Sequence, residues 1–92
     1  MDSYINIIGT CAACLTTSAL LPQVIRTIKT NDTSSLSLLF ALAINTGTML
    51  WLIYGILLGN PIITLSNAIV LILSGIIVFY KIRNIVIKQE KL

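Results

Sequence analysis

Few side chains in this sequence could take part in covalent chemistry. The chain has no His and only three Asp or Glu residues, none of them inside an apolar segment, so no nucleophile and base can be paired. Cys11 and Cys14 form a CxxC pair, a spacing that occurs in redox and metal sites. A reactive thiolate needs a polar, electropositive setting, whereas "TCAACL" is apolar and small enough for close helix packing. We therefore predict no enzyme, no metal and no cofactor.

Trp51 and Asn67 are better placed for recognition. Trp51 lies on an aromatic and apolar stripe of one face, which comprises Phe40, Ile44, Gly47, Trp51, Tyr54 and Leu58. Aromatic belts sit at headgroup level, but Trp51 is about 10 Å inward from Leu58 at 1.5 Å per helical residue. Asn67 is about 9 Å into the next segment, counted from Pro61. The two side chains should reach nearly the same depth on adjacent antiparallel helices.

This pair suits a sugar, because an amide offers donors and an acceptor to hydroxyls while an indole face packs on the C–H surface of a pyranose. Two plainer interpretations stay open. Trp51 could belong to a packing stripe, and Asn67 could join helices by a hydrogen bond. Asn45 and Thr48 are also deep, but they fall off the Trp51 face and are assigned to helix packing.

The composition places these residues in a membrane. Hydrophobic residues make up 57% of the chain and charged residues 10%, against about a quarter in soluble proteins. No charge occurs from residue 33 to residue 80. The first segment has no basic residue before it and is too long for a signal peptide, so we expect it to be retained as a span.

Three apolar runs are long enough to cross a bilayer, which takes about 20 residues each. We expect an all-α integral membrane protein of a single domain, with helices at about 5–28, 36–58 and 61–80. The polar stretch "KTNDTSS" offers N-caps from residue 32 onward, and "GNP" supplies a glycine end and a proline start. Residues 84–92 are expected to form a cytoplasmic tail.

The basic residues predict the orientation. Two lie at the end of the first span and four follow the third span, whereas the N-terminal segment and the "GNP" turn have none. By the positive-inside rule, the N-terminus lies outside and the C-terminus in the cytoplasm of a multi-pass protein of the cell (inner) membrane. The net charge of +3 therefore reflects topology, and no nucleic-acid partner is expected.

The inner parts of the spans hold no Asp, Glu, Lys, Arg or His. Proton relays and charged-solute sites normally leave such a group in the membrane. We therefore expect an uncoupled carrier or pore for a neutral solute. A non-transporting or holin-like pore-forming protein stays open as an alternative.

The sequence resembles the SemiSWEET sugar transporters of the SWEET and PQ-loop group. The resemblance covers residues 5–83 and rests on "LLPQVIRTIKTNDTSSLS", on "TMLWLIYGILLGNP" and on Asn67, 16 residues after Trp51. It implies a three-helix bundle with the third helix between the other two. It also implies a parallel homodimer around one central pathway.

The resemblance further implies roles for single residues. Trp51 and Asn67 of both protomers would bind the sugar, with Ser18 and Gly47 facing the same pocket. Tyr54 matches the extracellular gate, although Leu58 and Asn60 stand where a charged pair is often found. Phe40, about 16 Å from Trp51 on the same face, is the candidate intracellular gate.

The PQ dipeptide itself predicts a kink. Pro22 has no N–H and its ring clashes with the carbonyl of Ser18, while Gln23 can donate to freed backbone groups. We expect Pro22 to act as a hinge, with a static kink as the alternative. The expected function is facilitated, bidirectional uniport of a mono- or disaccharide such as glucose or sucrose, by alternating access. A PQ-loop transporter of another small neutral solute is the nearest alternative.

Overall fold

Three long helices make up nearly the whole chain. The computed structural model describes residues 3–92, and within them the helices are α1 (Ser3–Thr30), α2 (Leu38–Leu58) and α3 (Pro61–Lys88). Each is long and apolar enough to cross a membrane. At 1.5 Å per residue, α2 is about 31 Å long and so spans the hydrocarbon core, whereas α1 and α3 extend beyond it at about 42 Å.

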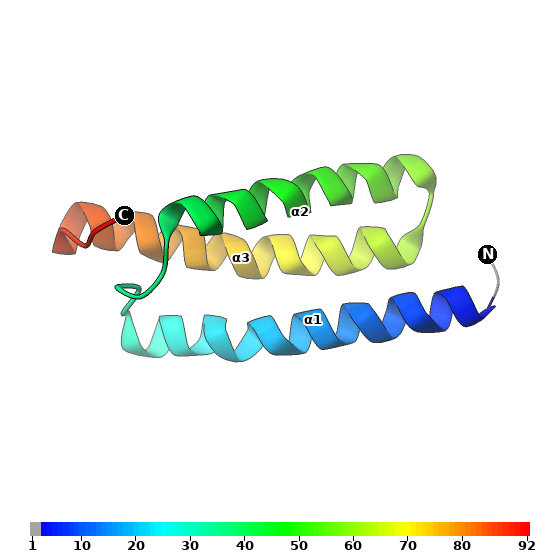
Figure 1. Cartoon of the computed structure of the whole chain (residues 1–92), viewed down its shortest axis with the longest axis horizontal. Helices are drawn as coiled ribbons and strands as arrows, with labels where there is room; N and C mark the ends of the chain where they lie inside the picture. Colours follow the sequence, from blue (N-terminus) through cyan, green and yellow to red (C-terminus); the bar gives the residue numbers. More distant parts are fainter. Residues whose placement is uncertain (1–2) are drawn as a thin grey trace.

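The third helix lies between the first two (Figure 1). It packs against both neighbours, whereas no Cα atom of α1 comes within 8 Å of one in α2 among the described residues. The Cα atoms span 50 × 23 × 14 Å, whereas those of one helix lie on a cylinder about 4.6 Å across, so the row of helices is bent. Because only α3 contacts both other helices within residues 3–92, the protomer is a single layer, which cannot enclose a solute pathway by itself.

The turn between α2 and α3 follows from its three residues. Gly59 ends α2 in the left-handed region, at φ 73°, and its N–H donates to Ile56. Asn60 caps α3, with its side-chain oxygen accepting from the N–H groups of Ile62 and Ile63 at 3.0 and 3.1 Å. Pro61 then occupies the first turn of α3, where no N–H is needed.

Small and polar residues hold α2 against α3. A Cβ on Gly55 would lie 2.9 Å from the backbone nitrogen of Thr64, so only glycine allows this approach. Further along, the side-chain amide of Asn45 donates to the hydroxyl of Ser74 at 2.9 Å. Asn45 thus joins the two helices, and Thr48 turns inward and bonds to the carbonyl of Ile44.

The surface of the layer is apolar. Val24 and Ile77 are buried hydrophobic residues, whereas large apolar side chains on all three helices are exposed, Leu57 at 82%. Such a surface is stable only against lipid or another protein.

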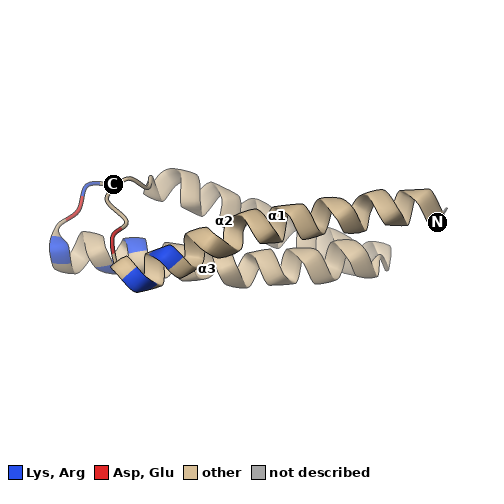
Figure 2. Cartoon of the chain, turned by 90° about the horizontal axis from the view of Figure 1, so that it is seen from below, with Lys and Arg blue, Asp and Glu red and all other residues tan. Residues whose placement is uncertain are grey.

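The charged residues of the described chain occupy one end of the layer. In residues 3–92, Lys and Arg lie at the end away from the N-terminus, on the last turns of α1, at the far end of α3 and in the residues after α3 (Figure 2). We call this the basic end. It also contains the connection between α1 and α2.

The helix ends differ in places from those expected. Helix α1 covers Ser3–Thr30 instead of 5–28 and runs through Pro22 as one element. Helix α2 begins at Leu38 because the hydroxyl of Ser37, not a residue of 32–35, accepts from the N–H of Phe40 at 3.2 Å.

The largest difference is at the end of α3. This helix continues to Lys88 rather than to about residue 80, so residues 84–88 of the expected tail are helical. The extension is stabilised by polar contacts with the α1–α2 loop that are described below. The first charged residue after the apolar run, Lys81, therefore does not end the helix.

Candidate solute site

Trp51 lies on an open groove of α2. Gly47, Leu50, Trp51 and Tyr54 line this groove, which has a volume of about 330 Å³. The ring of Tyr54 meets that of Trp51 edge to face, with centroids 5.6 Å apart, and Trp51 is 56% exposed. The structure thus brings together three predicted site residues, Gly47, Trp51 and Tyr54. They present an aromatic surface away from the packed interface with α3.

Asn67 lies at the height of Trp51 on the neighbouring helix. Gly55 is opposite Thr64 and Asn45 is opposite Ser74, so counting along either helix places Trp51 opposite Ala68. Asn67 is then within one residue, about 1.5 Å, of that level. Its side-chain N–H₂ donates to the carbonyl of Ile63 at 2.8 Å, and its side chain is half-buried. Asn67 does not line the Trp51 groove itself.

Ser18 faces a different hollow, between α1 and α3. This hollow has a volume of about 480 Å³, and its polar lining consists of Thr10, Cys14, Thr17, Ser18 and Ser66. Within one protomer, Ser18 and Trp51 therefore do not share a cavity.

The PQ residues lie toward the basic end. Pro22 lines an open hollow of α1 together with Ser18, Arg26 and Lys29. Gln23 instead shares a cavity of about 100 Å³ with Phe40 at the junction of the three helices. The side chain of Gln23 makes no hydrogen bond within residues 3–92, so the expected bond to a freed backbone group is absent from this conformation.

The comparisons with known proteins agree with this arrangement. The PQ-loop repeat family matches residues 4–64. An uncharacterized protein of Methanocaldococcus jannaschii is 44% identical over 91% of this chain and 90% of its own length. The sugar transporter SemiSWEET of Bradyrhizobium diazoefficiens is 42% identical over 90% of this chain and 98% of its own. The chain belongs to the SemiSWEET group of the PQ-loop family.

A solved structure extends the match to three dimensions. A crystal structure described as SemiSWEET in the inward-open conformation superposes with a TM-score of 0.86 at 30% identity, covering 96% of this chain and 95% of its own. The expected family and three-helix fold are thereby confirmed. The curated SemiSWEET relatives are named as transporters and not as enzymes.

The cysteines of this SemiSWEET are free thiols. Both Cys11 and Cys14 are exposed on α1, and Cys14 faces the hollow that also contains Ser18. No group of three or more potential metal ligands occurs among residues 3–92.

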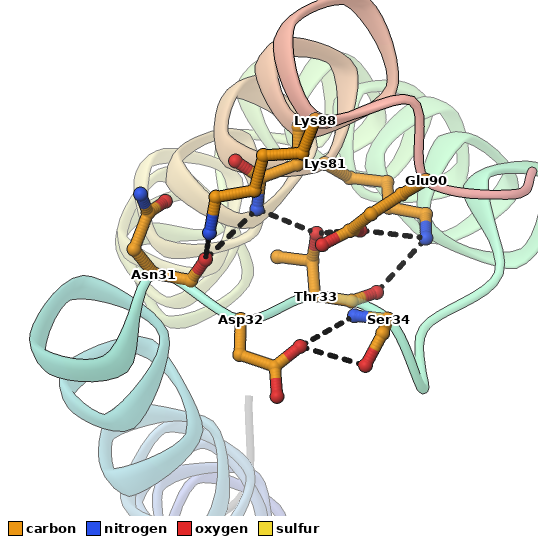
Figure 3. Close-up of polar contacts among 8 residues, drawn as sticks. Asn31, Asp32, Thr33, Ser34, Lys81, Lys88 and Glu90 are labelled. Carbon is orange, nitrogen blue, oxygen red and sulfur yellow. Dashed lines mark hydrogen bonds and ion pairs between the residues drawn. The ribbon is translucent and has the colours of Figure 1, made fainter.

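A polar cluster at the basic end was not predicted from the sequence (Figure 3). The ammonium group of Lys81 donates to the carbonyl of Thr33 at 2.9 Å and lies 3.3 Å from a carboxylate oxygen of Glu90. The hydroxyl of Thr33 donates to the same oxygen of Glu90 at 2.6 Å and accepts from the amide of Asn84 at 2.9 Å. We call Thr33, Lys81, Asn84 and Glu90 the loop clamp.

Hydrogen bonds lower the pKa of both acids at this end. For Glu90 the main cause is the bond from the Thr33 hydroxyl, followed by the bond and the charge of Lys81. For Asp32 it is the side-chain and backbone bonds from Ser34, with smaller effects of Lys88 and Arg26. Both carboxyls are therefore ionised at neutral pH.

The sequence did contain one signal for this cluster. The spacing of Lys81, Asn84 and Lys88 places the three residues on one side of a helix.

Proposed function

We propose that this protein is a facilitative, bidirectional transporter of a neutral mono- or disaccharide. The observation that carries the proposal is the open Trp51 groove, with Asn67 at the same height on the adjacent helix. An exposed indole in a membrane layer can pack on a sugar ring, and the amide of Asn67 can exchange its bond to Ile63 for bonds to hydroxyls. The relative from Bradyrhizobium diazoefficiens is named a sugar transporter.

The proposal includes a parallel homodimer. One protomer is a single layer, so its groove is open on one side, and a second copy in the same orientation would close it. In such a dimer Ser18, Gly47, Trp51 and Asn67 would line one central pathway. Tyr54 would form the outer gate, and Phe40 the inner gate.

The proposed orientation has the basic end in the cytoplasm of a cell membrane. All Lys and Arg residues of the described chain lie at that end, in agreement with the positive-inside rule (Figure 2). Alternating access would then open the pathway toward each side in turn, with Pro22 as the hinge in α1. We expect no coupling to protons, because the central parts of the helices carry no Asp, Glu, Lys, Arg or His.

Reconstituted vesicles test this proposal. Purified protein should give saturable uptake of labelled glucose or sucrose down a gradient, and an excess of the unlabelled transported sugar should compete with it. Imposing a pH gradient should leave the initial rate unchanged. A leak that neither saturates nor responds to competitors would instead support a pore, and flux of another neutral solute without flux of any sugar would refute the substrate class.

A further inference from the structure

The loop clamp at the basic end joins the α1–α2 loop to the end of α3 and to the residues that follow it. Its side chains are unusually buried for polar groups: Lys81 and Thr33 are fully inaccessible, and Asn84 is 1% exposed. Burying an ammonium group is costly unless it is paired and hydrogen-bonded. Here the pairing is complete, since no buried side-chain nitrogen or oxygen in residues 3–92 is left without a partner.

These bonds hold the α1–α2 loop on the end of α3. Lys81 and Asn84 donate to the carbonyls of Thr33 and Asn31, and Lys88 also donates to the carbonyl of Asn31, at 2.7 Å. Asn31 directly follows α1 and adopts a left-handed conformation, at φ 51°. The end of α1 is therefore fixed by contacts with α3.

The residues after α3, 89–92, connect the α1–α2 loop and Lys81 to the start of α2. Glu90 bridges Thr33 and Lys81, and two residues later the carbonyl of Leu92 accepts from the N–H of Leu38 at 2.9 Å. That N–H is the first of α2 and has no partner inside its own helix. Since the backbones of α1 and α2 do not contact each other, the clamp and the residues after α3 add to their packing on α3 in placing the two helix ends.

We propose that Thr33, Lys81, Asn84 and Glu90 are positioning residues for transport, which make the basic ends of α1 and α2 move together with α3. This inference rests on the proposed transport function. Between Pro22 and Asn31 lie about 13 Å of helix, a short segment with a proline at one end and the clamp at the other. Without the clamp this segment would be held less firmly relative to α2. The clamp acts through the loop and does not contact the solute, so its loss should reduce the maximal rate and leave the KM unchanged.

Thr33 offers a matched set of variants. Thr33→Val keeps the shape but removes the hydroxyl that bonds to Glu90 and Asn84, whereas Thr33→Ser keeps that hydroxyl. Ser34→Ala is the loop control, because Ser34 bonds only to Asp32 within the loop. Glu90→Gln keeps the side-chain shape and removes the charge. It provides a second comparison of a weakened clamp with wild type if Thr33→Val does not insert into the membrane.

Two measurements on the full-length protein in vesicles are needed. Hydrogen exchange should be faster over residues 23–37 in Thr33→Val and Glu90→Gln than in wild type, Thr33→Ser or Ser34→Ala. Maximal uptake should fall roughly fivefold in Thr33→Val and Glu90→Gln, because each weakens the hydrogen bonds of the clamp, with KM within about twofold of wild type. Unchanged exchange in both variants would overturn the inference.

The measurements separate this inference from the proposed function. Faster exchange with wild-type uptake would overturn the role of the clamp in transport and leave sugar transport intact. No sugar uptake by wild type would overturn the proposed function, and with it the transport role of the clamp. Lower uptake with a raised KM would mean that the clamp acts on solute binding, which also contradicts the inference.

Discussion

Lys81 shows how a single residue can differ from its expected role. Its charge predicted the end of the third span, but α3 continues past it, and the side chain is fully buried and paired instead of solvated. Lysine is rarely buried without a partner, and its partner Glu90 is brought to it by a turn of the tail that no local pattern indicates. The sequence therefore did not predict that the Lys81 side chain is buried or that it pairs with Glu90.

Glu90 predicts how stability depends on pH. Because its pKa is lowered in the folded protein, its contribution is complete above the pKa of an unfolded glutamate, about 4.3, and is lost as the pH falls through the lower folded value. Thermal stability in detergent should therefore be level near neutral pH and fall in acid. Glu90→Gln should be less stable at pH 7 and lose less on acidification. An identical acid-induced loss in wild type and Glu90→Gln would contradict this assignment, since Asp32 titrates in both.

At the scale of the helices, the closest contact predicts a sharp difference between two glycines. Gly55→Ala would place a Cβ against the Thr64 backbone and force α2 away from α3, at a cost of about 1–3 kcal/mol. Gly47→Ala is the control, because a Cβ there has nothing within 4 Å and alanine favours a helix. Melting temperatures in detergent should fall for Gly55→Ala and stay level or rise for Gly47→Ala. Equal melting temperatures would show that the helices do not pack this closely.

Helix α1 carries the prediction for the hinge. Pro22→Ala supplies an N–H to the carbonyl of Ser18 and removes a ring clash, so it should stiffen the helix without preventing insertion. Initial uptake rates should fall severalfold, because α1 would have to distort one additional backbone hydrogen bond each time it bends during transport. Pro61→Ala is the control, because a proline in the first turn of α3 constrains no hydrogen bond. A wild-type rate for Pro22→Ala would reduce Pro22 to a static kink.

The elements differ in how well the sequence determines them. The spans were predictable because apolar length and a "GNP" turn are local signals, and Asn45 was correctly assigned to packing. The end of α3 was missed because its extension is stabilised by a loop about 50 residues earlier in the chain, through pairs such as Asn84 with Thr33. Non-local bonds of this kind leave no periodic pattern.

For the whole molecule, the single-layer shape limits what one protomer can do. Trp51 and Asn67 were predicted to share a depth, and the register of α2 on α3 agrees with that expectation. That they form one pocket with Ser18 stays a prediction, since Ser18 faces another hollow within the protomer. The sequence could not decide this, because a pocket between two copies depends on how the layers face each other.

The most direct test of the account compares two exposed side chains of α2. Trp51→Ala and Leu57→Ala each remove a large apolar group, but only Trp51 lies in the proposed pathway. In vesicles with equal amounts of protein, Trp51→Ala should reduce saturable sugar uptake by roughly tenfold. This corresponds to about 1.4 kcal/mol of binding free energy lost with the contact between the indole and the sugar ring. Leu57→Ala should transport like wild type. Equal uptake by wild type and Trp51→Ala would contradict the central claim that this indole surface binds the transported sugar.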